Sequence, residues 1–136
     1  GVCKDCSKQR DLAGHVSMYQ RYKQTVTRNV RAYNLTLRGR YHKLVEVAKR
    51  MGWPCLGFEE YVTIVSQPCC YCRMPIESTV GYSLDRKDNA PDYTAANVVP
   101  CCKMCNATKS DLWSHDEFVE IGAVIGRLKQ NRQAAS

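Results

Sequence analysis

Apolar residues recur at steps of three and four along the first part of the chain, which is the spacing of one face of an α-helix. The stripe that they form consists of Tyr19, Tyr22, Val26, Val30, Tyr33, Leu37, Tyr41, Leu44, Ala48 and Met51. Residues 34–39 interrupt it with poor helix formers, including a glycine, which costs a helix about 1 kcal/mol relative to alanine. We therefore predict two helices, over about 12–34 and 37–51, or one kinked helix, with Gly52 and Pro54 ending it.

The elements that follow this stripe are short. Residues 58–65 have the spacing of a short amphipathic helix. Residues 82–87 alternate, which predicts a strand with Leu84 and Arg86 on one face and Asp85 on the other. After a turn, the return strand and a short helix are expected at 98–99 and at about 103–111.

The last periodic segment begins at a capping box, formed by Ser114 and Glu117. The apolar residues behind it have helical spacing and predict one buried face, made of Phe118, Ile121, Val124, Ile125 and Leu128. Beyond Asn131 we expect a disordered tail. The chain has no apolar run long enough to span a membrane, so we expect no membrane partner.

Two Cys-x-x-Cys pairs lie on either side of the predicted hairpin. Each such loop presents two thiolates to one ion, and two loops together complete a tetrahedral Zn²⁺ site. Cys70 and Cys101 would shift the register by one residue, but a single choice leaves two intervening residues in both pairs. The sequence therefore predicts a structural zinc ion bound by Cys69, Cys72, Cys102 and Cys105.

A third pair, Cys3 and Cys6, has no partner pair in the sequence. We favour a second zinc site that is completed by an upstream segment, which we expect because the sequence does not begin with Met. Residues of the chain itself could instead complete the site, and the candidates are His15, His42 and Cys55. Free thiols are the third alternative.

The length and the cysteine content of the chain bear on its stability and on the compartment in which it works. With 136 residues it has one domain's worth of sequence and a small core, which a zinc ion would help to stabilise. Nine cysteines in a secreted protein would suggest disulfides, but the sequence shows no signal peptide. We therefore expect an intracellular, reducing compartment, such as the cytoplasm or nucleoid of a bacterial or virus-infected cell.

Positive charge is concentrated in the first half of the chain. The net charge of +7 resides in residues 1–60, which hold 12 Lys/Arg against 5 Asp/Glu, whereas residues 61–136 hold 8 of each. Such a concentration favours a grip for a polyanion over a solvated face, and arginine offers phosphates a bidentate fork. We expect nucleic acid, foremost double-stranded DNA, to contact Arg28, Arg31, Arg38, Arg40 and Lys43. The near-heptad spacing of the apolar stripe leaves a homodimer as an alternative to simple packing.

One series of spaced motifs is similar to a known family. Its parts are Cys-x-Tyr-Cys at 69–72, Leu-Asp-Arg at 84–86, and Asn-Val-Val-Pro-Cys-Cys-Lys-Met-Cys-Asn-Ala-Thr-Lys at 97–109. Over about residues 58–122 the chain resembles the zinc-stapled branch of the HNH (ββα-metal, His-Me finger) nucleases. The resemblance implies an α+β fold with a ββα-metal core stapled by zinc, a basic N-terminal helical arm and a C-terminal helix. The arm would comprise residues 1–57 and the nuclease domain residues 58–136.

The resemblance also implies a second metal site. In that family an Asp at the end of the first strand and an Asn or His on the helix bind a divalent metal, while another Asn fixes the hairpin loop. Carried over, Asp85 and Asn106 would bind Mg²⁺ or Mn²⁺, and Asn97 would fix the loop. Carboxylate and amide oxygens are the hard ligands that Mg²⁺ prefers. Lys109, one turn beyond Asn106, would hold a phosphate.

The chain departs from the family at the general base. The family has a histidine directly after the metal-binding Asp, and this chain has Arg86, which cannot act as a base near neutral pH. We expect Arg86 to bind the scissile phosphate, or otherwise to pair with Asp88. The base would then be a metal-bound hydroxide or a side chain, and a nearby metal and Arg86 could lower the pKa of Tyr71 enough for this role. The other candidates are His42 and His115.

These motifs together predict a metal-dependent DNA endonuclease or nickase. The alternative is a catalytically inactive HNH-like nucleic-acid-binding or ribonucleoprotein structural protein, which the missing histidine favours. A zinc-ribbon transcription factor is a weaker third hypothesis, because it leaves the hairpin segment unexplained.

Overall fold

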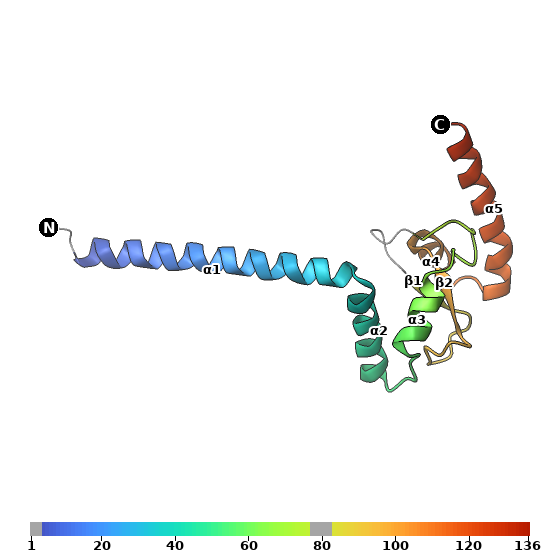
Figure 1. Cartoon of the computed structure of the whole chain (residues 1–136), viewed down its shortest axis with the longest axis horizontal. Coiled ribbons are helices and arrows are strands. Elements are labelled where there is room, and N and C mark those ends of the chain that lie inside the picture. Colours follow the sequence, from blue (N-terminus) through green and yellow to red (C-terminus); the bar gives the residue numbers. More distant parts are fainter. Residues whose placement is uncertain (1–3, 77–82) are drawn as a thin grey trace. The chain divides into compact units, whose positions relative to one another are not determined.

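The computed structural model of the chain is mostly helical, with one small β-hairpin (Figure 1). It describes residues 4–76 and 83–136, and only the backbone for residues 4–11, 13 and 83. Two compact units are separated along the chain, Gly1–Asn34 and Leu35–Ser136. The elements in order are α1 (Lys4–Leu35), α2 (Leu37–Met51), α3 (Phe58–Val65), β1 (Ser83–Arg86), β2 (Val98–Cys101), α4 (Lys103–Lys109) and α5 (His115–Ala134).

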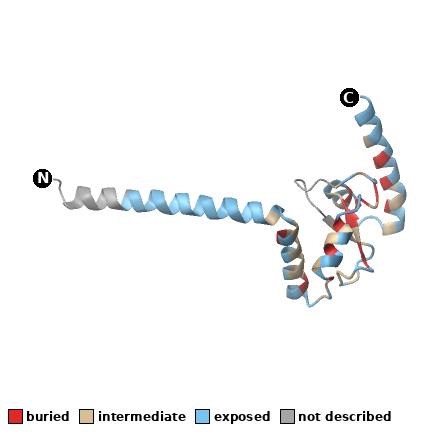
Figure 2. Cartoon of the chain, in the orientation of Figure 1, coloured by how far each residue is buried: buried red, intermediate tan, exposed pale blue. Residues whose placement is uncertain are grey.

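Apart from Asn34 at its end, the described side chains of helix α1 are all exposed, and Figure 2 shows most of this helix in pale blue. The predicted helix is confirmed, although it begins earlier, at Lys4. Even its large apolar side chains are open to solvent, and Tyr22 is 68% exposed. No described residue of this unit covers the part of the apolar stripe that lies on α1.

The break between α1 and α2 lies at Thr36. Its side chain caps α2 by accepting a hydrogen bond from the backbone N–H of Gly39 at 3.0 Å. Gly52, with a φ of 70°, ends the helix in the left-handed conformation that suits glycine. The predicted bounds 37–51 are therefore confirmed, and they follow from local capping signals.

Helices α2 and α3 enclose an aromatic core with the hairpin. The ring of Tyr41 lies 5.2 Å from that of Phe58 and 5.5 Å from that of Tyr61, and its hydroxyl donates to the carbonyl of Leu56 at 3.1 Å. Val65 and Val98 are buried in the same cluster. These contacts place α2, which the sequence analysis grouped with the basic arm, in the second unit.

The hairpin is a two-stranded antiparallel sheet in which Leu84 pairs with Pro100 and Asp85 with Val99. Because side chains alternate along a strand, its faces differ. Leu84 packs against the aromatic core, and Asp85 faces the cysteine-rich side described below. The predicted alternation is confirmed for these residues.

A second cluster packs around the cysteines, and α5 closes it. Phe118 is fully buried, with its ring edge-on to that of Tyr71 at 4.9 Å. The predicted buried face of α5 is only partly right, since Val124 and Leu128 are exposed. The helix also continues to Ala134, where a disordered tail was expected.

Two glycines turn α5 toward the cysteines in place of those apolar side chains. A Cβ atom at Gly122 would lie 2.6 Å from the Cβ of Tyr71, and one at Gly126 would lie 2.5 Å from the carbonyl oxygen of Cys72. Real Cβ atoms do not approach so closely, so only glycine allows this contact. The face of α5 that meets the cysteine loop therefore runs through Phe118, Gly122 and Gly126.

Candidate metal centre and hairpin site

Four thiols converge between the hairpin and α5. Their Sγ atoms all lie within 4.8 Å of one another, and three of the four side chains are buried. Thiolates at this number and spacing are the ligands of a structural tetrahedral Zn²⁺ site. The predicted set Cys69, Cys72, Cys102 and Cys105 is therefore brought together and could hold a structural zinc ion.

The backbone prepares both loops for this arrangement. In the first loop, the N–H of Arg73 donates to the carbonyl of Cys69 at 2.9 Å, and Arg73 has a positive φ of 62°. In the second, Cys102 is the N-cap of α4, and its sulfur accepts from the N–H of Cys105 at 3.4 Å. The N–H of Cys70 donates to the carbonyl of Pro100 at 2.9 Å, which ties the first loop to β2.

A cation from α5 lies beside the thiols. The Nζ atom of Lys129 is 3.6 Å from the Sγ atom of Cys72 and 3.9 Å from that of Cys102. Burial by itself would lower the pKa of Lys129, but the neighbouring thiolates outweigh it and raise the pKa. A Zn²⁺ site with four thiolates carries a net charge of −2, so a lysine here offsets part of it. No sequence motif had pointed to Lys129.

The other described cysteines do not belong to this set of four converging thiols. Cys101 is fully buried in the core, and burial raises the pKa of Cys70 to about 12. This agrees with the predicted register, in which neither is a ligand. All described cysteines are free thiols, as expected in a reducing compartment. The side chains of Cys3 and Cys6 lie outside the described residues, so a second zinc site stays a prediction.

On the cysteine side of the hairpin, Asp85 is held by two partners. Its Oδ2 atom accepts a hydrogen bond from the hydroxyl of Tyr71 and lies 3.1 Å from the Nζ atom of Lys109. Lys109, at the end of α4, also donates to the carbonyl of Arg86 at 3.3 Å. The two charged side chains are nearly buried, at 11% and 7% exposure. The candidate ligand and the candidate phosphate-binding lysine therefore form an internal ion pair.

A histidine from α5 completes this group. The Nδ1 atom of His115 lies 3.0 Å from the hydroxyl oxygen of Tyr71. Tyr71 is fully buried, and both its burial and its hydrogen bond to Asp85 raise its pKa. A catalytic Tyr71 was predicted to have a lowered pKa, but its surroundings raise the pKa instead. His42, the other candidate base in the predicted set, is exposed on α2, with its ring 6.5 Å from that of Tyr41.

Arg86 lies on the opposite face of β1. Its guanidinium carbon is 4.9 Å from the ring centre of Trp53 and 5.7 Å from that of Tyr93. One of its nitrogens donates to the carbonyl of Ala90 at 2.8 Å, which closes the hairpin loop. Asp88, the suggested ion-pair partner, accepts from the N–H of Ala90 at 2.7 Å. These contacts give Arg86 a clear structural role.

The two asparagines of the predicted site lie on different elements, Asn97 before β2 and Asn106 on α4. Asn97 is buried, and its Oδ1 atom accepts from the N–H of Asp88 at 3.1 Å, as a loop-fixing residue would. Asn106 lies on α4 three residues before Lys109, so the two share a helix face. Because Lys109 reaches Asp85, this face of α4 is directed toward β1.

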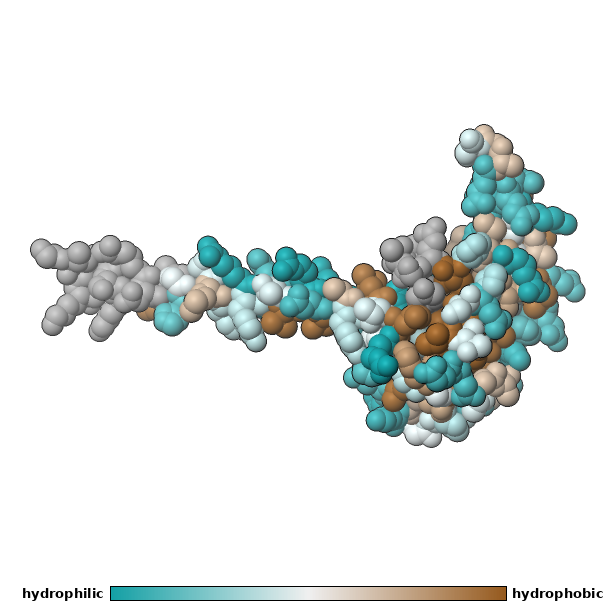
Figure 3. Space-filling model, viewed as in Figure 1, coloured by the Kyte–Doolittle hydropathy of each residue, from teal (hydrophilic) through white to brown (hydrophobic). Residues whose placement is uncertain are grey.

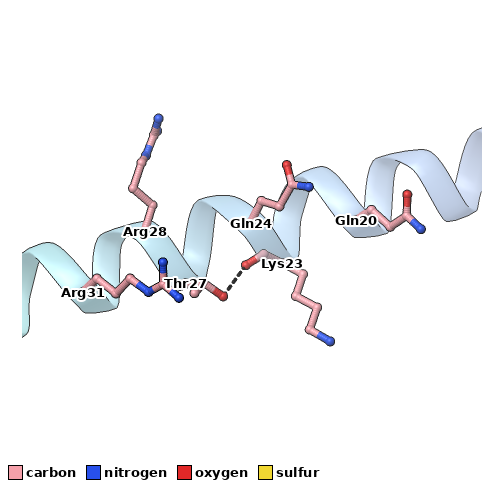
Figure 4. A pocket seen from close by; sticks show the side chains of 6 residues that line it. All are labelled: Gln20, Lys23, Gln24, Thr27, Arg28 and Arg31. Carbon is pink, nitrogen blue, oxygen red and sulfur yellow. Dashed lines mark hydrogen bonds between the residues drawn. The ribbon is translucent and has the colours of Figure 1, made fainter.

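The expected nucleic-acid contacts are divided between the units. Gln20, Lys23, Gln24, Thr27, Arg28 and Arg31 border a shallow hollow on the surface of α1 alone, and Figure 4 shows them projecting from this one helix. In the second unit, Arg40 and Lys43 line another hollow, together with Tyr61 and Leu84. The guanidinium of Arg38 instead covers the ring of Phe58 at 4.4 Å.

Comparison of the chain with protein-family models, with curated proteins and with solved structures found no match. Among the described residues, no helix combines the length and apolar character that a membrane span requires.

Proposed function

We propose that the protein is a metal-dependent nuclease of the HNH type, in which the hairpin and α4 carry the site. The observation that best supports this is the nearly buried carboxylate of Asp85, which a cation already neutralises. An isolated buried carboxylate is unfavourable, so this position attracts positive charge. Lys109 supplies that charge here, and a divalent cation with Asn106 as a second oxygen ligand could supply it in the catalytic state.

The donor set fits a Mg²⁺ or Mn²⁺ ion. Mg²⁺ typically takes one or two protein oxygens and keeps several waters or phosphate oxygens. A cation bound at Asp85 would stabilise the charge that develops on the scissile phosphate and on the leaving oxygen. Lys109, released from Asp85 by the cation, would then be free to hold a phosphate. The same lysine thus serves as a counter-ion before binding and as a phosphate contact afterwards.

Nucleic acid would be held chiefly by the basic side chains. Arg28 and Arg31 on α1, and Arg40 and Lys43 on α2, are all at least partly exposed. Contacts of this kind are to phosphates, carry no sequence information and weaken steeply with salt. Arg86 would contact a phosphate only through those guanidinium nitrogens that its stacking on Trp53 and Tyr93 leaves accessible.

Cleavage of plasmid DNA with Mg²⁺ or Mn²⁺ tests this proposal. Asp85→Asn keeps an acceptor for Tyr71 but removes the charge, and should abolish cleavage with DNA affinity nearly unchanged. It also leaves the buried ammonium group of Lys109 without its counter-ion, which should lower the free energy of unfolding by about 3–5 kcal/mol. The double variant Asp85→Asn/Lys109→Met restores neutrality and separates loss of activity from loss of folding. Asp111→Asn, which changes an exposed carboxylate, is the matched control and should cleave normally.

An inactive nucleic-acid-binding protein is the second candidate, and one observation favours it. Asp85 is satisfied by Tyr71 and Lys109 without a metal, and Arg86 is engaged in stacking. A wild-type protein that binds nucleic acid but cuts neither DNA nor RNA with any divalent ion would establish this candidate and exclude the nuclease.

A further inference from the structure

The hydroxyl group of Tyr71 has one proton and lies between two hydrogen-bonding partners, Asp85 and His115. Asp85 is paired with the ammonium group of Lys109 and is therefore an ionised carboxylate, which can only accept hydrogen bonds. Tyr71 must then donate its single hydroxyl proton to Asp85. Only lone pairs of the hydroxyl oxygen remain for the Nδ1 atom of His115 at 3.0 Å, so this nitrogen must be the donor.

We propose that Tyr71 fixes His115 in the tautomer protonated at Nδ1, so that Nε2 presents a free lone pair beside the hairpin and serves as the general base. This rests on the proposed nuclease function and names the group that replaces the family's missing histidine. The ring is partly exposed, and a neutral imidazole held in one tautomer by its other nitrogen is the usual form of a histidine base.

In this role His115 accepts one proton at Nε2 from the attacking water. The water oxygen forms a bond to phosphorus, the bond from phosphorus to the leaving oxygen breaks, and solvent protonates the leaving oxygen. Tyr71 keeps its proton throughout and acts as a positioning residue. The charged groups around the pair are Asp85, which accepts from Tyr71, and Lys109, whose Nζ atom lies 3.1 Å from Asp85 in this structure.

The tautomer can be measured without any nuclease activity. Long-range proton–nitrogen NMR spectra of the zinc-loaded full chain distinguish a protonated from an unprotonated ring nitrogen. We expect Nδ1–H and bare Nε2 for His115, while His15 and His42 serve as internal references. Tyr71→Phe removes one oxygen and should shift His115 toward a mixture of tautomers. Protonation of His115 at Nε2 in the wild type would overturn the inference.

Two variants test the base role. His115→Asn retains an N–H near the Nδ1 position, so it keeps the contact with Tyr71 but lacks Nε2. It should lose about 10²–10⁴-fold in kcat, the usual contribution of a general base. Glu120→Gln, which changes an exposed side chain on the same helix, is the matched control and should cleave normally. If the wild type and His115→Asn cut equally well while Asp85→Asn is inactive, the base role is wrong and the nuclease proposal stands. If the wild type cleaves no nucleic acid, the base role of His115 and the nuclease proposal are both wrong.

A second inference concerns α1 and rests on a separate observation. Its exposed apolar residues continue as a heptad, with Val16 and Val30 at a positions and Leu12, Tyr19, Val26 and Tyr33 at d positions. Figure 3 shows brown patches gathered along one side of this helix. From Leu12 to Tyr33 the stripe covers about three heptads, which is about six helical turns or about 33 Å of helix.

The charges on α1 avoid the positions that flank this seam. The e positions are Gln20, Thr27 and Asn34, and the g positions are His15, Tyr22 and Asn29, so none carries an acid or a permanent cation. Arg21 and Arg28 lie at f, opposite the seam. A different, acidic partner helix would find no cation at e or g to pair with, whereas two copies of this cationic helix can meet without flanking repulsion.

We infer that α1 pairs with α1 of a second copy as a parallel two-stranded coiled coil. Valine at a positions favours two strands, and Lys23 occupies the remaining a position, where a single polar residue specifies register and oligomeric state at a cost in stability. Figure 4 shows Lys23 and Arg28 pointing to opposite sides of the helix, as a and f positions require. Pairing would leave Arg21 and Arg28 of both copies outside for phosphates.

Sedimentation of the full chain at several concentrations tests the pairing. The wild type should be a dimer, and Val30→Asp should raise the dissociation constant at least about tenfold by placing an unpaired charge in the seam. Gln24→Asp adds the same charge outside the seam and should leave dimerisation intact. Lys23→Leu should tighten the dimer, a gain that no other face of the helix would give. A monomer at all concentrations, or equal effects of the two Asp variants, would overturn the inference.

Discussion

Helix α1, called the arm from here on, and the second unit, Leu35–Ser136, are stabilised in opposite ways. Helix α1 runs through 32 residues, and its described side chains are open to solvent apart from Asn34 at its end. In the second unit, each strand has 4 residues and α4 has 7, too few to form alone. Several of their side chains are nevertheless buried, namely Val98, Cys101, Cys105 and Lys109. The helical structure of α1 therefore depends on its length, whereas the short elements of the second unit depend on contacts between distant segments.

This difference shows what the cysteines contribute. A two-stranded hairpin is marginal in water, and here it lies between two thiol-bearing loops and the glycine face of α5. Binding of a structural ion becomes folding free energy, because the unfolded chain has no preformed site. The described side chains of α1 form no such cluster, and its central residues include Thr25, Val26 and Thr27, which are weak helix formers.

Removal of zinc should have the largest effect and should separate the two regions. Chelation or Cys102→Ser should unfold residues 35–136, since the affinity of structural zinc is on the order of 10–16 kcal/mol in zinc-finger peptides. Hydrogen exchange should show loss of protection in α3, α4 and α5. Metal analysis should find at least one Zn²⁺ per chain before the treatment. A folded second unit without zinc would show that packing alone supports it.

A pair of glycine substitutions should give effects of opposite sign. Gly126→Ala places a Cβ atom 2.5 Å from the carbonyl oxygen of Cys72, so it should destabilise the second unit by about 1–3 kcal/mol. Gly14→Ala meets nothing within 4 Å and should stabilise the arm by about 0.5–1 kcal/mol. Denaturant unfolding followed by circular dichroism measures both. Equal effects would mean that α5 does not approach the cysteine loop as closely as described.

Arm charges should affect binding and leave the second unit intact. Arg28→Ala with Arg31→Ala should weaken DNA affinity for all sequences and reduce the slope of log K against log salt by about 2. Zinc content and the unfolding transition of residues 35–136 should not change. Arg38→Ala is the informative contrast, because it also removes a cation from the ring of Phe58 and should lower stability. An unchanged salt slope would mean that the arm does not touch phosphates.

The cap between the regions should have the smallest effect. Thr36→Ala removes the acceptor for the N–H of Gly39 and should destabilise α2 by about 1 kcal/mol. Thr36→Ser keeps the hydroxyl and is the matched control. Thermal unfolding of both variants would measure the difference, and an Ala variant as stable as the Ser variant would show that the cap contributes little.

Several features could be predicted from the sequence because their signals are local. Gly52 and the capping box at Ser114 and Glu117 mark helix ends, since each acts on backbone groups within four residues. The strand alternation placed Leu84 and Asp85 on opposite faces for a similar reason. The cysteine spacing was equally informative, because two intervening residues fit one geometry of metal binding.

Other features depended on contacts between distant segments, which no local pattern encodes. The sequence offered Tyr71 as a base and Arg86 as a phosphate ligand, but burial and Asp85 raise the pKa of the first, and Trp53 and Tyr93 stack on the second. The helical spacing also predicted Val124 and Leu128 as core residues, but both are exposed. Apolar character alone does not tell which face of a helix a neighbouring segment covers. Gly122 and Gly126 decided that face, because only a residue without a Cβ lets α5 reach the cysteine loop. The local rules thus determined the elements, and the close approach of distant backbones decided which side chains meet at Asp85.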